Sequence, residues 1–276
     1  MIQSFDGKVA VITGAASGIG RALAMGVAKE GMRVVAADID EAGAQATAES
    51  IGKDAVAFRV DVAQGDSVSA LANASFERFG QVDLLVNNAG VFQGGLSWER
   101  SVEDWEWALG VNVWGILHAM RSFVPRMIAQ GTEGHVVNTA SVAAFVAGPA
   151  SAPYVVSKCA ALSATECLAL DLAAVGSKIG ASVLTPSAFE TGIATTARVR
   201  PARFGVDESE DGKGTAQALG AMVSEGMAPD AAVEPVLAGI RSGEFVIPTR
   251  PSYAAQIRNR YDALLDRKLP SLMEVD

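Results

Sequence analysis

Three residues in the stretch 141–158, SVAAFVAGPASAPYVVSK, have types and spacing that suit acid–base chemistry. Tyr154 and Lys158 are four residues apart, and Ser141 lies 13 residues before Tyr154. On a helix, residues i and i+4 share one face at about 5–6 Å, so the Lys158 ammonium would lie beside the Tyr154 phenol. A neighbouring cation favours the phenolate and lowers the tyrosine pKa toward neutrality. The stretch therefore predicts a general acid/base with a hydroxyl close by.

The same pair has a simpler interpretation, because Tyr and Lys at this spacing are common on helices that do no chemistry. The position of Ser141 favours the catalytic one. It ends the apolar run HVVNTAS, which is typical of a buried parallel strand. Strand ends along one edge of an α/β sheet are where such folds bind ligands. We therefore expect Ser141, Tyr154 and Lys158 to meet at that edge.

A glycine-rich turn near the N-terminus predicts where a dinucleotide would bind. The β-branched run 8–13 is followed by Gly14-Ala-Ala-Ser17-Gly18-Ile19-Gly20 and then by a helical segment that ends at Gly31. Glycines let the backbone approach a pyrophosphate, which would sit on free N–H groups at the positive end of the helix dipole. The spacing is G-x-x-x-G-x-G, and a tight turn without a ligand is the alternative.

The acidic residue at the end of the next strand, 33–38, indicates which of the two nicotinamide dinucleotides would bind. Asp38 lies 18 residues past Gly20, close to the distance at which a carboxylate meets the adenosine ribose. Such a carboxylate would accept hydrogen bonds from the ribose hydroxyls and repel a 2′-phosphate. Positions 15–19 and 39 carry no basic residue that would attract that phosphate. NAD is therefore favoured over NADP.

Strands and helices continue to alternate along the chain, which predicts one α/β domain over 1–276. The further strands are expected at 55–61, 82–89, 181–186 and 245–248, and the further helices at 64–79, 102–130, 152–175 and 253–268. Pro125 is expected to kink the long helix at 102–130. A long insert at about 187–227, irregular and punctuated by glycine and proline, is typical of a lid or binding loop. The acidic run 207–211 within it is expected to be a solvated face.

Three further segments, at 61, 88–90 and 112, carry polar or small residues where a cofactor or the site would lie. Asp61 could bond the adenine edge or cap the following helix. Asn88, Ala89 and Gly90 would form a floor against which a cofactor lies closely. Asn112, inside the apolar run GVNVWGIL, must find partners, either backbone groups in a helix bulge or a polar network at the site.

Composition excludes several classes of function. Lys and Arg number 22 against 31 Asp and Glu, and the net charge of −9 disfavours nucleic acid and anionic membranes. The N-terminus shows no signal peptide, and the uncharged stretch 136–157 carries prolines and hydroxyls that a lipid-facing helix avoids. Cys159 and Cys167 would lie about 12 Å apart on one helix, too far for a disulfide, and are expected to be buried. These features predict a cytoplasmic protein.

A metal site is not expected. His118 and His135 are the two histidines, and no carboxylate or thiol cluster stands near either at ligand spacing.

Taken in order, these motifs resemble the short-chain dehydrogenase/reductase family over about residues 5–191. The residues concerned are TGAASGIG at 13–20, Asp38, Asp61 with Val62, NNAG at 87–90, Asn112, Ser141, YVVSK at 154–158 and PSAFET at 186–191. The resemblance implies a Rossmann-type, doubly wound sheet of seven parallel strands with helices on both faces.

The family's roles carry over to these matching residues. The resemblance implies that Asn112, Ser141, Tyr154 and Lys158 form the catalytic set, with Tyr154 exchanging the proton, Ser141 orienting the substrate oxygen and Asn112 anchoring a relay water. Tyr154 and Lys158 also belong to the cofactor set. The remaining cofactor residues implied are Gly14, Ser17, Gly18, Ile19, Gly20, Asp38, Asp61, Val62, Asn88, Ala89, Gly90, Pro186, Phe189 and Thr191. Ser187 stands where many members have glycine, which puts the local loop path in question.

The segments 185–205, 123–131 and 245–248 are also similar to bacterial dehydrogenases that oxidise the benzylic Cα alcohol of lignin-type β-aryl ethers. A bulky aromatic alcohol would suit an apolar site. Aromatic residues that could form such a site, or could be ordinary core, are Phe92, Trp98, Phe145 and Phe189. Trp105, Trp107 and Trp114 are assigned to packing or to a subunit interface.

Three functions remain open. The first is NAD-dependent oxidation of a secondary alcohol, with the ketone as product. The second is an NADPH-type reductase of 3-oxoacyl or ketone substrates, which Asp38 disfavours. The third is a dinucleotide-sensing protein without turnover, which the presence of both Tyr154 and Lys158 disfavours. Apolar residues around the helices at 102–130 and 152–175 predict a face that needs a partner chain. The family resemblance implies that this partner is another copy, in a homodimer or homotetramer.

Overall fold

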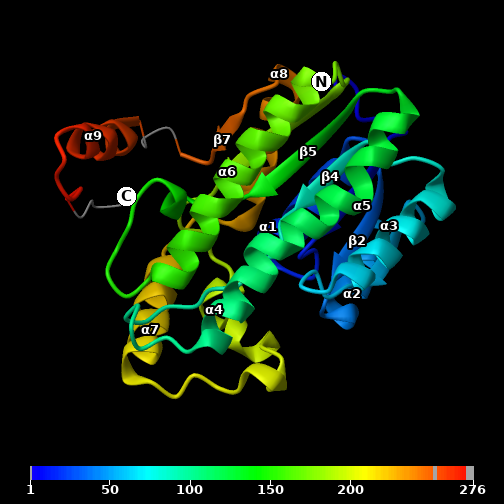
Figure 1. The fold of residues 1–276 in the computed structure, drawn as a ribbon. Coiled ribbons are helices and arrows are strands. Elements are labelled where there is room, and N and C mark those ends of the chain that lie inside the picture. Colours follow the sequence, from blue (N-terminus) through cyan, green and yellow to red (C-terminus); the bar gives the residue numbers. More distant parts are fainter. Residues whose placement is uncertain (1, 251–253, 272–276) are drawn as a thin grey trace.

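The computed structural model describes residues 2–250 and 254–271. Its centre is one sheet of seven parallel strands in the order β3-β2-β1-β4-β5-β6-β7 (Figure 1). The strands are β1 Val9–Thr13, β2 Arg33–Asp38, β3 Ala55–Arg59, β4 Leu84–Asn87, β5 Gly134–Thr139, β6 Ile179–Thr185 and β7 Val246–Pro248. The expected doubly wound seven-stranded sheet is confirmed.

The strands are continuous apolar runs because helices cover both faces of the sheet. Within β1, Val9 and Val11 enter one buried cluster, whereas Ala10 and Ile12 enter another on the opposite face. The first cluster receives side chains from α3 (Gly65–Phe79), α5 (Gly115–Gln130) and α6 (Ala152–Ala174). The second receives side chains from α1 (Gly18–Lys29), α2 (Glu41–Ile51) and α8 (Val233–Ser242).

A short line of polar side chains crosses the first of these layers. The side-chain amide of Asn87 on β4 donates to Asn138 Oδ1 on β5 at 2.8 Å. The amide of Asn138 in turn donates to Thr165 Oγ1 on α6 at 3.0 Å. All three side chains are buried, so these hydrogen bonds join two central strands to the helix that carries Tyr154.

The long helical segment after β4 is divided at a different place from the one expected. It consists of α4 (Val102–Leu109), a π-helical turn (Gly110–Trp114) and α5. Pro125 lies inside α5, which continues past it to Gln130. The interruption of α-helical geometry therefore falls at the π-helical turn that contains Asn112, and α5 remains helical through Pro125, where a kink was expected.

The insert after β6 contains more regular structure than expected. Two 3₁₀ segments, Gly192–Val199 and Ala202–Phe204, precede helix α7 (Glu210–Ser224), and a third, Pro229–Ala232, leads into α8. The terminal helix is α9 (Ala254–Leu265), and residue 253, where it was expected to begin, lies outside the described residues. Figure 1 shows α9 at the edge of the molecule, apart from the sheet.

Cys159 is half-buried and Cys167 is exposed, so the expectation that both are buried is wrong; both are free. Among residues 2–250 and 254–271, no helix has the length and apolar character that a membrane crossing requires.

Candidate active site

A pocket of about 560 Å³ opens along the carboxyl ends of the strands. The residues that follow β1, β2, β3, β4, β5 and β6 all contribute to its lining. Strand order reverses between β1 and β4, so the two connecting segments diverge there and leave the crevice in which such sheets bind ligands.

The glycine-rich turn forms one end of this pocket. Gly14 has φ +70°, and a Cβ there would stand 2.8 Å from Asn88 Nδ2 and 2.9 Å from Ala89 Cα. Gly18, with φ +54°, opens α1 and faces the Thr191 methyl group. The Ser17 side chain makes no hydrogen bond to the start of α1, so the first N–H groups of the helix lack a capping acceptor. This cradle and its donors fit a dinucleotide pyrophosphate.

Thr13, which the sequence reading passed over, ties the turn to the end of β4. Its hydroxyl oxygen accepts hydrogen bonds from the backbone N–H groups of Asn88 at 3.0 Å and Ala89 at 3.1 Å. The Asn88 amide donates to the Thr13 carbonyl oxygen at 3.1 Å. Gly20 does not line the pocket, because it is buried behind the turn, where a Cβ would lie 2.1 Å from the Gly14 carbonyl oxygen.

Asp38 and Asp61 both line the pocket. The backbone N–H of Ala16 donates to Asp38 Oδ2 and that of Asp40 to Oδ1, each at 2.9 Å. Burial raises the pKa of Asp38, and these backbone hydrogen bonds act against the rise. Asp61 Oδ1 accepts from Ala63 N at 3.0 Å. Helix α3 begins later and takes Gln64 as its N-cap, so Asp61 is not the cap of that helix.

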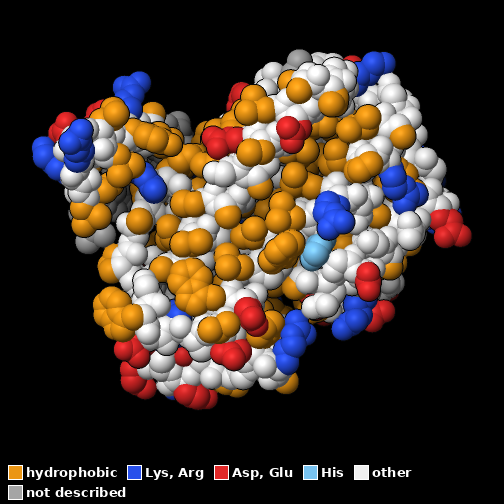
Figure 2. All heavy atoms as spheres, viewed as in Figure 1, with side chains coloured by type: hydrophobic (Ala, Val, Ile, Leu, Met, Phe, Trp, Pro, Cys, Tyr) orange, Lys and Arg blue, Asp and Glu red, His pale blue; other side chains and the backbone are white. Residues whose placement is uncertain are grey.

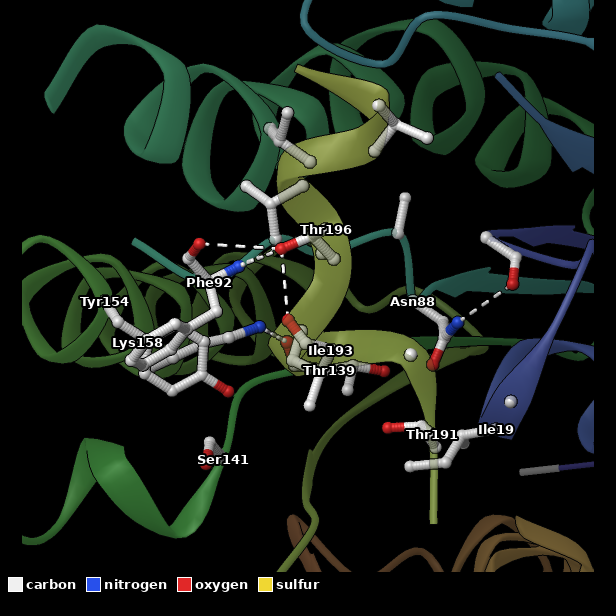
Figure 3. A pocket seen from close by; sticks show the side chains of 18 of the residues that line it. Ile19, Asn88, Phe92, Thr139, Ser141, Tyr154, Lys158, Thr191, Ile193 and Thr196 are labelled. Carbon is white, nitrogen blue, oxygen red and sulfur yellow. Dashed lines mark hydrogen bonds between the residues drawn. The ribbon is translucent and has the colours of Figure 1, made fainter. Parts of the chain in front are cut away.

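Ser141, Tyr154 and Lys158 are brought together at the other end of the pocket. Figure 3 shows the Tyr154 hydroxyl directed toward Ser141, with Lys158 beside the tyrosine. Lys158 Nζ lies 5.5 Å from the centre of the Tyr154 ring and donates to the Thr139 carbonyl oxygen at 3.1 Å. The Phe92 ring also packs against the tyrosine, with 5.2 Å between the two ring centres.

The electrostatics of this group differ from the expectation. Burial raises the pKa of Tyr154, and a hydrogen bond from Ser141 lowers it by less. Burial also lowers the pKa of Lys158 to about 8. The pKa of Tyr154 is shifted by burial and by Ser141 and not by Lys158, so the predicted lowering of the tyrosine pKa by Lys158 is not found in this structure.

Asn112 lies behind the pocket and not in its lining. Its Oδ1 accepts from Val91 N at 2.8 Å, and its Nδ2 donates to Val91 O and to Ser157 Oγ, both at 2.9 Å. Asn112 lies in the π-helical turn, which directs its amide at both partners. The two alternatives left open by the sequence, backbone partners in a helix bulge and a polar network at the site, therefore both occur. Ser157, which the sequence reading missed, links Asn112 to the Tyr154 carbonyl oxygen at 2.7 Å.

The remaining pocket wall is mostly apolar, although Glu106, Arg198 and Arg203 also line it. Its aromatic residues differ in part from those expected. Phe92 and Phe189 line it as predicted, whereas Trp98 and Phe145 do not. Trp98 is 78% exposed on the loop before α4. Trp107, which was assigned to packing or to a subunit interface, lines the pocket. Residues of the insert that line it with Trp107 include Ile193, Thr196, Arg198, Val199, Pro201, Arg203, Phe204, Leu219 and Met222.

Ser187 keeps an ordinary path for the loop after β6. Its backbone φ is not in the left-handed region, so a side chain there causes no strain. The Ser187 N–H donates to Thr249 Oγ1 at 3.1 Å, and Ser187 lines the pocket next to Pro186. The other residues expected at the cofactor that line the pocket are Ser17, Ile19, Val62, Asn88, Ala89, Gly90, Phe189 and Thr191.

The acidic run 207–211 is only in part the solvated face expected from the sequence, because Glu208 and Glu210 are exposed whereas Asp207 and Asp211 are not. Asp207 and Asp211 form ion pairs with Arg100, whose side chain is 1% exposed. Elsewhere in the described part of the chain, no group of three or more His, Cys, Asp or Glu side chains is arranged to hold a metal ion.

A parallel sheet of this order, with a glycine turn at one end of its crevice and a serine, tyrosine and lysine at the other, defines a class of dinucleotide-dependent oxidoreductases. Residues 8–201 match the family described as short chain dehydrogenase, and the chain belongs to that family. Members of the family bind nicotinamide dinucleotides.

Relatives of known type extend over the whole chain. It is 31% identical to a C alpha-dehydrogenase of Sphingobium sp., with 100% of this chain and 90% of the relative covered. It is also 31% identical to a CLA biosynthesis dehydrogenase/reductase of Lactiplantibacillus plantarum, with 100% and 99% covered. A solved short-chain dehydrogenase/reductase from Burkholderia phymatum, in complex with NAD, is 39% identical, covers 100% of both chains and has a TM-score of 0.96.

Proposed function

We propose that this protein is an NAD-dependent dehydrogenase of a bulky, apolar or aromatic secondary alcohol. The observation that carries the proposal is the convergence of Ser141, Tyr154 and Lys158 on one pocket, between the glycine turn and an apolar wall. The NAD complex of the similar Burkholderia protein and the C alpha-dehydrogenase name of the Sphingobium relative support it.

In this proposal each residue has one task. When bound, the nicotinamide supplies the hydride acceptor for the alcohol carbon. Tyr154 takes the alcohol hydroxyl proton at its oxygen when it is in the phenolate form, which its raised pKa makes the minor form, and it returns the proton in the reverse direction. Ser141 holds the substrate oxygen by a hydrogen bond. Lys158 is predominantly cationic at pH 7, because its pKa of about 8 lies above that pH, and its free N–H groups are available to the cofactor ribose.

The preference for NAD rests on Asp38. Its two oxygens each accept one backbone hydrogen bond and retain lone pairs for ribose hydroxyls. Asp38, Ile39 and Asp40 line this end of the pocket, so a 2′-phosphate would meet two carboxylates there. The enzyme should therefore discriminate against NADP by charge repulsion.

Screening aromatic and alicyclic secondary alcohols with NAD and with NADP, by NADH or NADPH absorbance, tests the proposal. We expect turnover of at least one aromatic alcohol with NAD and much slower turnover with NADP. The Tyr154→Phe variant should lose about 10²–10⁴-fold in kcat while still binding NADH, because it lacks only the proton-transfer group. Full activity of Tyr154→Phe, or a preference for NADP, would contradict it.

A further inference from the structure

Five charged side chains are drawn together beside the apolar end of the pocket. They come from the segment after β4 (Arg100 and Asp104) and from the insert (Arg200, Asp207 and Asp211). Arg100 pairs with Asp207 at 2.5 Å and with Asp211 at 3.0 Å, and Arg200 pairs with Asp104 at 2.7 Å. We call this group the charge clamp.

Polar groups around the charge clamp satisfy much of its remaining hydrogen-bonding capacity. Ser209 Oγ accepts from Arg100 Nη2 at 2.8 Å and donates to Asp207 Oδ1. The backbone N–H of Leu96 donates to Asp211 Oδ2 at 2.6 Å. Gln93 donates to Asp207 Oδ2 and accepts from Arg200 Nη1, each at 2.9 Å. These bonds join residues more than 100 positions apart in the chain.

The charge clamp holds both sides of the apolar wall. Arg200 lies between Val199 and Pro201, which line the pocket. Its Nη2 donates to the carbonyl oxygen of Phe204, another lining residue, at 2.7 Å. Its guanidinium lies 5.1 Å from the ring centre of Trp107, a lining residue of α4. Arg200 therefore contacts both the insert and α4 at the point where each of them lines the pocket.

The charge clamp also reaches the helix that carries Tyr154. Gly95 has φ +111°, and a Cβ there would lie 2.4 Å from Arg100 Nε, so the backbone passes directly over the guanidinium. The N–H of the same Gly95 donates to the Ala150 carbonyl oxygen at 2.7 Å, immediately before α6. The segment that carries the charge clamp is thus fixed to the start of the catalytic helix.

We propose that the charge clamp makes residues 196–211 a fixed wall of the substrate site, and that Arg200 is a positioning residue that sets how well bulky alcohols bind. The proposal rests on the proposed function for its substrate class. Opening the wall as a lid would separate buried charges from their partners, which is strongly unfavourable. A large apolar substituent of the substrate would pack against Phe204, Val199 and Trp107. A small alcohol would contact only the end of the pocket that carries Ser141, Tyr154 and Lys158.

Hydrogen exchange of the full-length protein tests the fixed wall without any substrate. Peptides covering 196–211 should exchange far more slowly than α9, and NADH should leave their rate unchanged within about twofold. Exchange as fast as that of α9, or strong protection that appears only with NADH, would show a mobile lid and overturn the proposal.

Kinetics of Arg200→Met test the positioning role, with 1-phenylethanol as the small alcohol and 1-(2-naphthyl)ethanol as the bulky one. The KM for the naphthyl alcohol should rise at least about tenfold, while its kcat, the NADH Kd and the phenyl KM change less than about threefold. Arg200→Lys should recover part of the loss. Lys213→Met, which removes an exposed ion pair with Glu208 in the same insert, should match the wild type.

The double variant Asp104→Asn/Arg200→Met guards against misfolding, because it removes both charges of one pair and leaves neither buried alone. It should show the same selective rise in KM. Equal losses for the two alcohols, or no change in any variant, would overturn the positioning role. If the wild type oxidises neither alcohol, a small and a bulky alcohol that it oxidises in the screen replace them. If it oxidises no alcohol of the screen, the proposed function fails, and hydrogen exchange alone then decides whether the wall is fixed.

Discussion

Lys158 is a buried cation whose hydrogen-bond acceptor is a backbone carbonyl, that of Thr139, and not a carboxylate. Desolvation therefore lowers its pKa to about 8. Because the folded pKa lies below the ordinary value of 10.5, the charged lysine destabilises the fold below pH 8, and this penalty disappears as the pH rises toward 10.5. A ligand that offers hydroxyl acceptors to the ammonium should hold the proton on it.

We predict that NADH binding weakens as the pH rises past 8. One pH unit above the pKa only about a tenth of Lys158 stays charged, so the Kd should rise roughly tenfold between pH 7 and 9. Fluorescence titration of NADH at both values measures this. Lys158→Met should bind weakly at both, with little pH dependence of its own. A similar pH slope in the variant and the wild type would assign the effect to another group.

The π-helical turn Gly110–Trp114 is the element that sets the floor of the pocket. It directs Asn112 to both backbone groups of Val91, the residue after Gly90, and to Ser157 on α6. Gly90 separates this amide from the lysine: a Cβ there would stand 3.5 Å from Asn112 Oδ1 and 3.4 Å from Lys158 Nζ. The turn thus links three segments of the site through one side chain.

Replacing Asn112 by Ala should leave the Val91 N–H and carbonyl groups buried without partners. We expect a loss of about 2–4 kcal/mol in the free energy of unfolding. Urea denaturation measures it. Ser157→Ala removes fewer of these hydrogen bonds and should lose less. If both variants lose the same amount, the amide does not hold the backbone of Val91 as described.

The sequence predicted the elements whose signals are local. The glycine turn, the acid at the end of β2, and the Tyr154–Lys158 spacing each depend on residues close in the chain, and the structure places them around one pocket. The π-helical turn was not predictable, because GVNVWGIL reads as an apolar helix. The ion pairs of Asp207 and Asp211 were missed for the opposite reason. Their partner Arg100 lies more than 100 residues away in the chain, so the pairing is a property of the tertiary structure.

The same limit explains the errors over aromatic residues. Hydrophobicity indicates that either Trp98 or Trp107 could be buried, and it does not indicate which of the two lines the pocket. The fold turns Trp107 toward the pocket on α4 and leaves Trp98 exposed on the preceding loop. The direction of the Tyr154 pKa shift could not be predicted from the sequence either. It depends on the burial of the phenol and not on the i, i+4 spacing alone.

At the scale of the whole molecule, one face carries apolar side chains that the chain itself leaves uncovered. Figure 2, in the orientation of Figure 1, shows hydrophobic side chains gathered over α5 and α6. Large exposed side chains on or next to these helices include Trp114, Val156 and Leu170, the last 70% exposed. A patch of this kind usually marks a protein–protein contact. We propose a second copy of the chain as its partner.

Sedimentation at micromolar concentration should therefore show a dimer or tetramer. The double variant Val156→Lys/Leu170→Glu should shift it to a smaller species, because charges would have to be desolvated in the contact. Leu265→Glu, an equally drastic change at an exposed position of α9, is the matched control and should keep the wild-type state. A monomeric wild type would rule out the proposed contact.

The buried amide line from Asn87 through Asn138 to Thr165 has a consequence for how the chain selects this fold. Asn87 and Asn138 are register partners on β4 and β5, within strands that are otherwise apolar. Two apolar strands could pair in a shifted register and still bury their apolar side chains. Sliding β4 along β5 would leave the two amides opposite apolar side chains with their hydrogen bonds broken, so misaligned sheets are penalised. The pair thereby specifies the alignment of the two strands whose ends bring Ser141 and residues 88–90 to the same pocket.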